Sequence, residues 1–416
     1  MQLKRVVVTG LGAITPLGNN VTDYWNNLVN GVSGAALITR FDASKFKTRF
    51  ACEVKGFDPL SILERKEARK LDLFAQFAMG SSKEAIEDAG MLNNNAIDPD
   101  RVGVIWGSGI GGLKTFYDEC AAFAKGDGTP RFNPFFIPKM IADIASGHIS
   151  IQYGYRGPNY TTVSACASST HAMIDSFNYI RLGKADIIVT GGSEAAVNEA
   201  GVGGFNALQA LSLRNDDPTT ASRPFDHERD GFVLGEGTAC IILEEYEHAK
   251  KRGAKIYAEV VGGGMTADAH HITAPHPEGL GALNVMREAL RDAGMKAEEI
   301  DYINVHGTST PLGDIAETKA IEQVFGEHAY NLNISSSKSM TGHLLGAAGA
   351  IESIACIMSV KEDIVSPTIN HFNDDPAFDK RLNFTFNKAQ KRVVNAALSN
   401  TFGFGGHNAS VIFKKI

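Results

Sequence analysis

The sequence predicts an α/β protein whose strands form substantially parallel sheets. Short runs rich in β-branched residues alternate with longer amphipathic runs, which is the pattern of α/β layers. Glycines cluster at the ends of apolar runs, where tight strand-to-helix turns bring backbone close to backbone or ligand. The expected strands are Arg5–Thr9, Arg101–Trp106, Tyr160–Ser164, Asp186–Thr190, Thr238–Glu244, Ile256–Gly262, Ile300–Val305, Leu332–Ser335, Leu382–Phe386, Ala396–Asn400 and Ala409–Phe413.

Helical patterns fill the intervals between these strands. The expected helices are Ala68–Ala89, Ser168–Leu182, Gly281–Ala293, Ile315–Phe325 and Leu344–Val360. Both halves of the chain open with a strand-like run and later place a reactive side chain between a strand end and a small-residue helix. We therefore expect two similar halves, residues 1–250 and 251–416, joined near the charged segment Glu245–Ala254.

The charge and composition of the chain argue against several classes of protein function. The net charge of −7 on 416 residues does not favour nucleic acid or an anionic membrane as a partner. The five cysteines are dispersed and form no CxxC pair, which fits reduced thiols better than a disulfide framework. No apolar run approaches the roughly 20 residues of a membrane span, and the N-terminal run does not resemble a signal peptide. The expected location is the cytoplasm.

Cys166 is the first candidate for chemistry. It lies at the turn between the strand ending at Ser164 and a helix beginning Ala-Ser-Ser-Thr, so the backbone N–H groups and dipole of the helix start should favour its thiolate. Small neighbours would let a substrate approach. The alternative is a buried cysteine that acts as a small hydrophobic residue, which is the interpretation we give to the other four.

Two histidines stand at comparable junctions in the second half. His306 ends an apolar strand before Gly307, and His343 precedes the small-residue run Leu-Leu-Gly-Ala-Ala-Gly-Ala. Side chains at such strand-to-helix junctions converge on one crevice more readily than side chains on an exposed face. Cys with His suggests an acyl thioester intermediate. Two histidines around one thioester oxygen suit stabilisation of an enolate, whereas a hydrolase needs one polarised histidine and access for water.

Lys338 and a glycine-rich turn complete the candidate set. Lys338 follows a buried strand within a run of small residues, so it is expected to be partly buried beside an acid. The possible partners are Asp314, Glu317 and Glu352, and an exposed loop lysine is the alternative. In Thr401-Phe-Gly-Phe404-Gly-Gly-His407, the glycines could aim a backbone N–H into a site while the Phe404 ring swings, or the segment could be a plain hairpin turn.

These residues resemble, in order and spacing, the elongating 3-oxoacyl-(acyl-carrier-protein) synthases of type II. Further matching motifs are Ser222-Arg-Pro-Phe-Asp226, Arg229-Asp-Gly-Phe-Val-Leu-Gly-Glu-Gly237 and Gly346-Ala-Ala-Gly-Ala350, and the likeness extends from Val6 to Ile416. Initiating synthases carry Asn in place of the second histidine, and thiolases carry a second late cysteine. The resemblance implies the thiolase fold, with two similar α/β halves in a five-layer αβαβα arrangement, and a homodimer.

The resemblance also implies roles. Cys166 accepts the acyl chain, with its own N–H and that of Phe404 as the oxyanion hole. His306 and His343 bind the malonyl thioester oxygen during decarboxylation, and Lys338 supports His343 and the local electrostatic field. The residues that would contact substrate are Ile110, Thr308, Thr310 and Phe402. Ile110 would lie in the acyl pocket, as in type II enzymes. The basic residues Lys66, Arg69 and Lys70 would dock acyl carrier protein, or would form only a solvated helix face.

No cofactor is expected for the chemistry, because the substrates carry their phosphopantetheine on acyl carrier protein. No metal site is expected either: His270, His271 and His276 lie in a proline-containing loop with no familiar ligand spacing. His407 stands where many family members carry Thr. The alternatives are a type I or polyketide-type condensing enzyme, a cysteine hydrolase, or a catalytically silent partner subunit. Silent subunits lack the cysteine that this chain retains.

Overall fold

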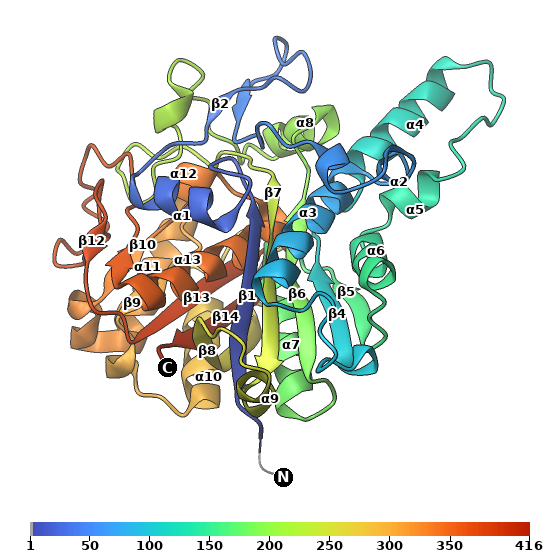
Figure 1. Ribbon diagram of the computed structural model, residues 1–416. Helices are drawn as coiled ribbons and strands as arrows, with labels where there is room; N and C mark the ends of the chain where they lie inside the picture. The colour runs from blue at the N-terminus through green and yellow to red at the C-terminus, as the bar shows by residue number, and fades with distance from the viewer. Residues whose placement is uncertain (1–2) are drawn as a thin grey trace.

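A computed structural model describes residues 3–416, so the first two residues of the expected first half lie outside it (Figure 1). Ten strands form one mixed sheet in the order β10-β9-β13-β14-β8-β1-β7-β6-β4-β5. Their bounds are β1 Val6–Ile14, β4 Val102–Gly107, β5 Asn159–Thr162, β6 Ile187–Glu194, β7 Gly237–Glu245, β8 Ala258–Ala267, β9 Tyr302–Asn304, β10 Asn333–Ser335, β13 Ala396–Gly403 and β14 His407–Lys414. The short strands β2 Ala36–Leu37, β3 Phe50–Ala51, β11 Ile364–Val365 and β12 Gln390–Lys391 form two small separate pairs.

The strand order repeats between the halves of the chain. The first half contributes β5-β4-β6-β7-β1 from the edge inward, and the second half contributes β10-β9-β13-β14-β8. In each set the outer three strands are parallel and the inner pairings are antiparallel. The two sets meet where β1 pairs with β8. The sheet is therefore less parallel than expected, because hairpin-like returns such as β13–β14 supply its centre.

Helices divide the molecule into five layers, and the expected thiolase-like αβαβα architecture is confirmed. The α-helices are α1 Val21–Val29, α2 Arg65–Ala68, α3 Leu73–Asp88, α4 Leu113–Lys125, α5 Phe136–Met140, α6 Ile144–Tyr153, α7 Ser168–Arg181, α8 Glu199–Ala207, α9 Tyr246–Lys251, α10 Leu280–Ala293, α11 Pro311–Phe325, α12 Lys338–Thr341 and α13 Ala348–Glu362. Helices α7 and α13 pack against each other between the two halves of the sheet. Helices α3 and α6 cover one outer face, and α10, with α11 packed on it, covers the other.

The central position of α13 follows from its composition. Every residue from Ala348 to Val360 is buried, and a helix that is apolar or small on all sides must lie inside the protein. Helix α7 begins with Ser168, Ser169 and Thr170, whose small side chains let the strands approach closely. The two helices carry the functional turns at their N-termini, so their contact brings those turns together.

Two expected elements differ from the structure. Residues Leu382–Phe386 form isolated bridges through Asn383 and Phe386 instead of a strand. The expected helix Ala68–Ala89 is split into α2 and α3, because Asp72 takes an extended conformation and caps the N–H of Phe74. Among residues 3–416, no helix combines the length and the apolar character that crossing a bilayer requires.

Candidate active site

Cys166 lies on a strained turn between β5 and α7. Ala165 has a φ of 50°, in the left-handed region that non-glycine residues rarely adopt, and a 3-10 turn over Ala165–Ala167 leads into the helix. The equivalent turn in the second half is built in the same way: Leu345 also has a φ of 50° and begins the 3-10 turn before α13. The two turns contact each other, which places Cys166 of one half beside the histidines of the other.

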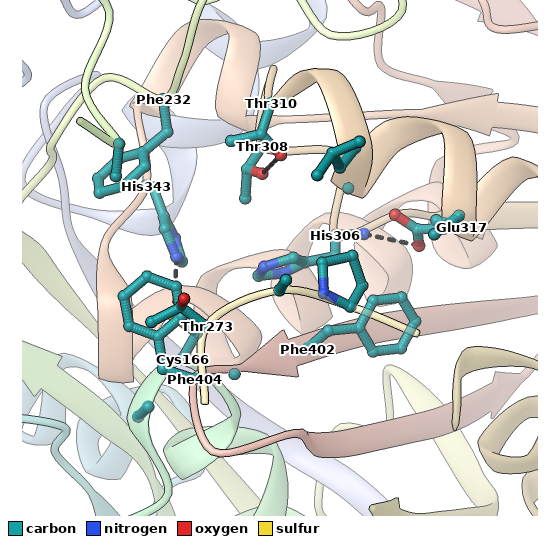
Figure 2. Close-up of a pocket in the computed structure, with 18 of the residues that line it drawn as sticks. Cys166, Phe232, Thr273, His306, Thr308, Thr310, Glu317, His343, Phe402 and Phe404 are labelled. Atoms are coloured by element: carbon teal, nitrogen blue, oxygen red, sulfur yellow. Dashed lines mark hydrogen bonds between the residues drawn. The ribbon is translucent and has the colours of Figure 1, made fainter. Parts of the chain in front are cut away.

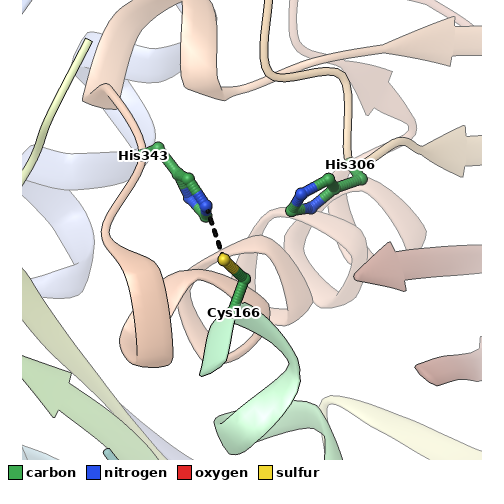
Figure 3. A group of neighbouring side chains, drawn as sticks. All are labelled: Cys166, His306 and His343. Atoms are coloured by element: carbon green, nitrogen blue, oxygen red, sulfur yellow. Dashed lines mark hydrogen bonds between the residues drawn. The ribbon is translucent and has the colours of Figure 1, made fainter. Parts of the chain in front are cut away.

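The thiol and the two imidazoles converge as Figure 3 shows. The Sγ atom of Cys166 lies 3.0 Å from Nε2 of His343. The rings of His306 and His343 are 5.2 Å apart between centroids and are nearly perpendicular, at 87°. One nitrogen of each ring and the sulfur all lie within 4.8 Å of one another. Only 8% of Cys166 is exposed, so any substrate must reach it through a cavity.

Burial dominates the protonation of all three groups. It raises the pKa of the Cys166 thiol to about 12, although Lys338 and a hydrogen bond from the backbone of Phe404 act in the opposite direction. Burial therefore opposes the thiolate that the helix start is expected to favour. Burial, followed by the charge of Lys338, lowers the pKa of His306 and of His343 well below the usual value. The resting site holds a thiol and two neutral imidazoles.

Each of the three candidate acids near Lys338 has a separate task. Glu352 on α13 forms the buried ion pair with Lys338. Glu317 on α11 accepts the backbone N–H groups of His306 and Gly307, each at 2.9 Å, and so orients the turn that carries His306. Asp314 lies 3.5 Å from Arg229 of the first half. Burial raises the pKa of Glu352 to about 7, and the charge of Lys338 opposes that rise.

The glycine-rich turn joins β13 to β14 directly beside the thiol. Figure 2 shows Phe404 next to Cys166, and the backbone of Phe404 hydrogen-bonds the sulfur. A Cβ on Gly403 would lie 2.9 Å from the carbonyl oxygen of Ser164, so a larger residue would displace this turn. Gly405 and Gly406 both have positive φ angles. The turn therefore presents an N–H group to the site and leaves the Phe404 ring half-buried at its edge.

A cavity of about 560 Å³ surrounds these groups. It brings together the expected residues Ile110, Cys166, His306, Thr308, Thr310, His343, Phe402 and Phe404. The Thr308 and Thr310 hydroxyls lie 3.1 Å apart on one wall, and the ring of Phe402 lies 5.6 Å from that of His306 (Figure 2). An apolar cavity with a few convergent polar groups is the usual form of a small-molecule site.

Hydrogen bonds hold the backbone around Ile110 at three consecutive residues. The N–H groups of Gly109 and Ile110 donate to the carboxylate of Glu194 at 2.8 and 3.2 Å, and the N–H of Gly111 donates to Ser108. The side chain of Ile110 is 38% exposed. With its backbone held in this way, Ile110 can move most readily by a change of side-chain rotamer.

The expected docking residues lie on the surface, on and just after α2. Lys66 and Arg69 are exposed, whereas Lys70 pairs with Glu67 at 2.6 Å and lies over the ring of Phe135. Lys66 and Arg69 thus carry most of the unpaired positive charge of this cluster.

Sequence reasoning missed several residues of the site. The ring of Phe232 meets that of His343 edge-on at 5.4 Å, and His271 and His276 line the cavity. Phe232 stands within the motif Arg229–Gly237 and Glu194 stands in none of the motifs quoted above. Nothing in the sequence marked either residue as part of the site. Within residues 3–416, one group of potential metal ligands lies close enough together to hold an ion. It consists of Cys166, His306 and His343.

The chain matches known proteins along most of its length. Residues 3–249 match the family model described as "Beta-ketoacyl synthase, N-terminal domain", and residues 257–372 match "Beta-ketoacyl synthase, C-terminal domain". The chain is 52% identical to a 3-oxoacyl-(acyl-carrier-protein) synthase 2 from Synechocystis sp., over all of this chain and 99% of the relative. It is 49% identical to the protein of the same name from Coxiella burnetii, over the full length of both.

One solved structure of a similar protein contains a partner. It is described as a type II polyketide synthase acyl-carrier protein in complex with its ketosynthase bound to the hexaketide. The matching chain shares 33% of its residues with this one, each chain is covered completely, and the TM-score is 0.90.

Proposed function

This chain belongs to the beta-ketoacyl synthase family, and from that membership we propose how its site performs decarboxylative condensation. The reaction joins malonyl-acyl-carrier protein to an enzyme-bound acyl thioester and yields 3-oxoacyl-acyl-carrier protein and CO2, as in fatty-acid chain elongation. The observation that carries the assignment of roles is the 3.0 Å contact between Cys166 Sγ and His343 Nε2 at the wall of an apolar cavity.

Acyl transfer comes first and requires a proton to move. The thiol of Cys166 is protonated at rest, so its proton passes to the neutral Nε2 of His343 as sulfur attacks the acyl thioester. The N–H groups of Cys166 and Phe404 stabilise the tetrahedral oxyanion. When the carrier thiolate leaves, His343 returns the proton to it, and the acyl chain remains on Cys166.

Decarboxylation then generates the nucleophile. The malonyl carboxylate leaves as CO2, and its bonding electrons form an enolate whose oxygen accepts the N–H of His306 and that of His343, in the His343 tautomer that now carries its proton on Nε2. The carbanion attacks the acyl carbon on Cys166, the C–S bond breaks, and the released thiolate takes up one proton. Loss of CO2 supplies the carbanion without a redox step or a metal, so we propose that no cofactor is required. Zinc bound by Cys166, His306 and His343 would block this chemistry by occupying the nucleophile.

The remaining cavity residues suit the handling of substrate. Thr308 and Thr310 place two hydroxyl groups where the amides of a pantetheine arm could bind. Phe404 stands beside the thiol on a glycine-flanked turn and gates access to the acyl pocket, and Phe402 supports the His306 wall. Ile110 lies on the wall of the cavity and contacts the acyl chain.

We propose acyl carrier protein as the macromolecular partner, with Lys66, Arg69 and Lys70 as its docking surface. Acidic surfaces are attracted to such a basic cluster, and the ketosynthase in the solved complex binds an acyl-carrier protein. We also propose a homodimer. Strand β5 is an edge of the sheet, and the protruding segment of α4, α5 and the loop between them (Figure 1) exposes Phe116, Phe132 and Ile137. The five free cysteines support a cytoplasmic location.

Product analysis tests the function directly. The protein is incubated with malonyl-acyl-carrier protein and acyl-carrier proteins of several chain lengths, and products are identified by mass. The expected product is a 3-oxoacyl chain longer by the two-carbon unit of malonate. Repeated extension of the same chain would favour the polyketide-type alternative, release of free acid would favour a hydrolase, and absence of condensation would favour a silent subunit. The same assay after treatment with a chelator tests the proposal that no metal is needed.

A further inference from the structure

Glu194 is a buried carboxylate for which the mechanism above has no use. It ends strand β6 and is completely buried. Its Oε2 atom accepts the N–H groups of Gly109 at 2.8 Å and Gly346 at 3.0 Å. Its Oε1 atom accepts the N–H of Ile110 at 3.2 Å and the hydroxyl of Ser108 at 3.3 Å. Burial raises the pKa of Glu194 to about 7, and the hydrogen bonds from these four donors oppose that rise.

The four donors come from two turns that belong to different halves of the chain. Ser108, Gly109 and Ile110 form the turn after β4, whereas Gly346 lies in the turn that leads into α13. The backbones touch: a Cβ on Gly346 would lie 2.3 Å from the nitrogen of Gly109 and 2.7 Å from the Glu194 carboxylate. Glu194 therefore fixes the position of the Ser108–Gly111 turn relative to the α13 turn.

The fixed turn carries a wall of the substrate cavity. Gly109 and Ile110 line the cavity, as does Leu345 immediately before Gly346. Because the backbone at Ile110 is held, its exposed side chain can yield to a ligand only by changing rotamer. The resistance of this wall to a long acyl chain thus depends on how firmly the turn is anchored.

We propose that Glu194 is a specificity-determining positioning residue that limits the acyl chain length accepted at Ile110. This inference rests on the condensing activity proposed above. Glu194 contacts the backbone beneath Ile110, so it acts through the turn. Loosening the anchor lets the Ile110 wall retreat, and this favours long acyl chains over short ones.

The test is Glu194→Gln, which preserves volume but leaves a single side-chain oxygen. Two of the four donors then lose their acceptor, and the longer bonds at Ile110 and Ser108 are the ones expected to fail. Acylation of Cys166 is followed by intact mass with a short and a long acyl-acyl-carrier protein. The long-to-short ratio of acylation rates should rise about tenfold. Ser108→Ala removes one donor to Glu194 and the acceptor of Gly111, so it should change the ratio in the same direction by less.

The matched control is Glu236→Gln. Glu236 is also buried, and it accepts the N–H of Val54 at 3.0 Å and a 2.8 Å bond from Arg40, both outside the cavity lining. This variant should leave the ratio unchanged. If Glu194→Gln and Ser108→Ala slow both chain lengths equally, Glu194 has only a structural role and the inference is wrong. If the wild-type protein accepts no acyl chain on Cys166, the proposed function fails, and this inference fails with it.

Discussion

The Sγ atom of Cys166 and the Nε2 atom of His343 lie 3.0 Å apart although their turns follow strands at opposite edges of the ten-stranded sheet. Cys166 follows β5 and His343 follows β10. The sheet folds around α7 and α13, so the two edges present their turns to each other. The active site therefore exists only when both halves are packed together, and neither half holds a nucleophile with its proton acceptor.

Cys166 should be the only cysteine that an acyl substrate modifies. Cys52, Cys240 and Cys356 are buried in the core, whereas Cys166 lines the cavity. Peptide mapping after incubation with acyl-acyl-carrier protein should place one acyl group on Cys166, and Cys166→Ala should remove it. Cys120 on α4 is partly exposed and serves as the control for non-specific reaction. An adduct that survives in Cys166→Ala would refute the assignment of the nucleophile.

Substitutions of the two histidines should separate the half-reactions. His306→Ala removes a donor to the enolate but leaves the contact between Cys166 and His343, so decarboxylation should fall by about a hundredfold while acylation persists. His343→Ala should impair both steps. Cys166→Gln places an amide where the acylated thiol stands, so it should release CO2 from malonyl-acyl-carrier protein without condensation. Normal decarboxylation by both histidine variants would contradict the proposed roles.

Much of the site could be predicted because its residues stand at strand ends. Cys166 and His306 each follow a predicted strand, and strand-to-helix junctions are where an α/β fold gathers side chains, whereas His343 follows the short helix α12. Motifs that lie within a single turn, such as Gly403–Gly406, could also be recognised from the sequence. The five layers came from the family resemblance, and the strand order was not predicted, because alternation of elements does not specify which strands are neighbours.

The features that could not be predicted have a common physical source, which is tertiary burial. The pKa of Cys166 is raised because the folded protein removes water from the thiol, and no local feature of the sequence reports that desolvation. The choice of Glu352 over Asp314 and Glu317 as the partner of Lys338 depends on how α11 and α13 pack. Glu194 binds backbone groups as many as 152 positions away, so its sequence neighbours give no sign of its contacts.

Lys338 should determine the acid limit of acyl transfer. Its positive charge disfavours the imidazolium form and so helps to keep the pKa of His343 low. In Lys338→Met that pKa rises, and His343 becomes protonated and unable to accept the proton of Cys166 at a higher pH than in the wild type. The measurement is the rate of Cys166 acylation against pH, and the acid limb should move to higher pH.

The Lys338 experiment requires two controls. Lys338→Met leaves the buried Glu352 without its partner, so the double variant with Glu352→Gln removes that unpaired acid and should show the same displacement. Lys319→Met replaces an exposed lysine on α11 and should leave the profile unchanged. An acid limb that stays in place in the double variant would mean that Lys338 does not act on His343 through its charge.

Charge reversal at the basic cluster should weaken carrier-protein binding. Lys66→Glu combined with Arg69→Glu should raise KM for acyl-acyl-carrier protein, with little change in kcat or in KM for an acyl-pantetheine substrate. The effect should shrink as salt is added, because exposed charges are screened. The matched control is Lys250→Glu with Lys251→Glu on α9, which lies at the opposite end of the molecule from α2 in Figure 1. Equal changes for both substrates would make the cluster a solvated helix face.

Ile110 should set the depth of the acyl pocket through its side chain. Its backbone is held by Glu194, so a long acyl chain must turn the sec-butyl side chain aside. Ile110→Phe puts a larger ring on a fixed backbone, and it should restrict acylation to short chains. Ile110→Gly opens the wall, and it should leave short chains nearly unaffected because they do not reach the vacated space. The measurement is kcat/KM for short, medium and long acyl-carrier proteins with each variant. A uniform loss at every length in Ile110→Phe would mean that residue 110 supports the protein core rather than selecting the chain.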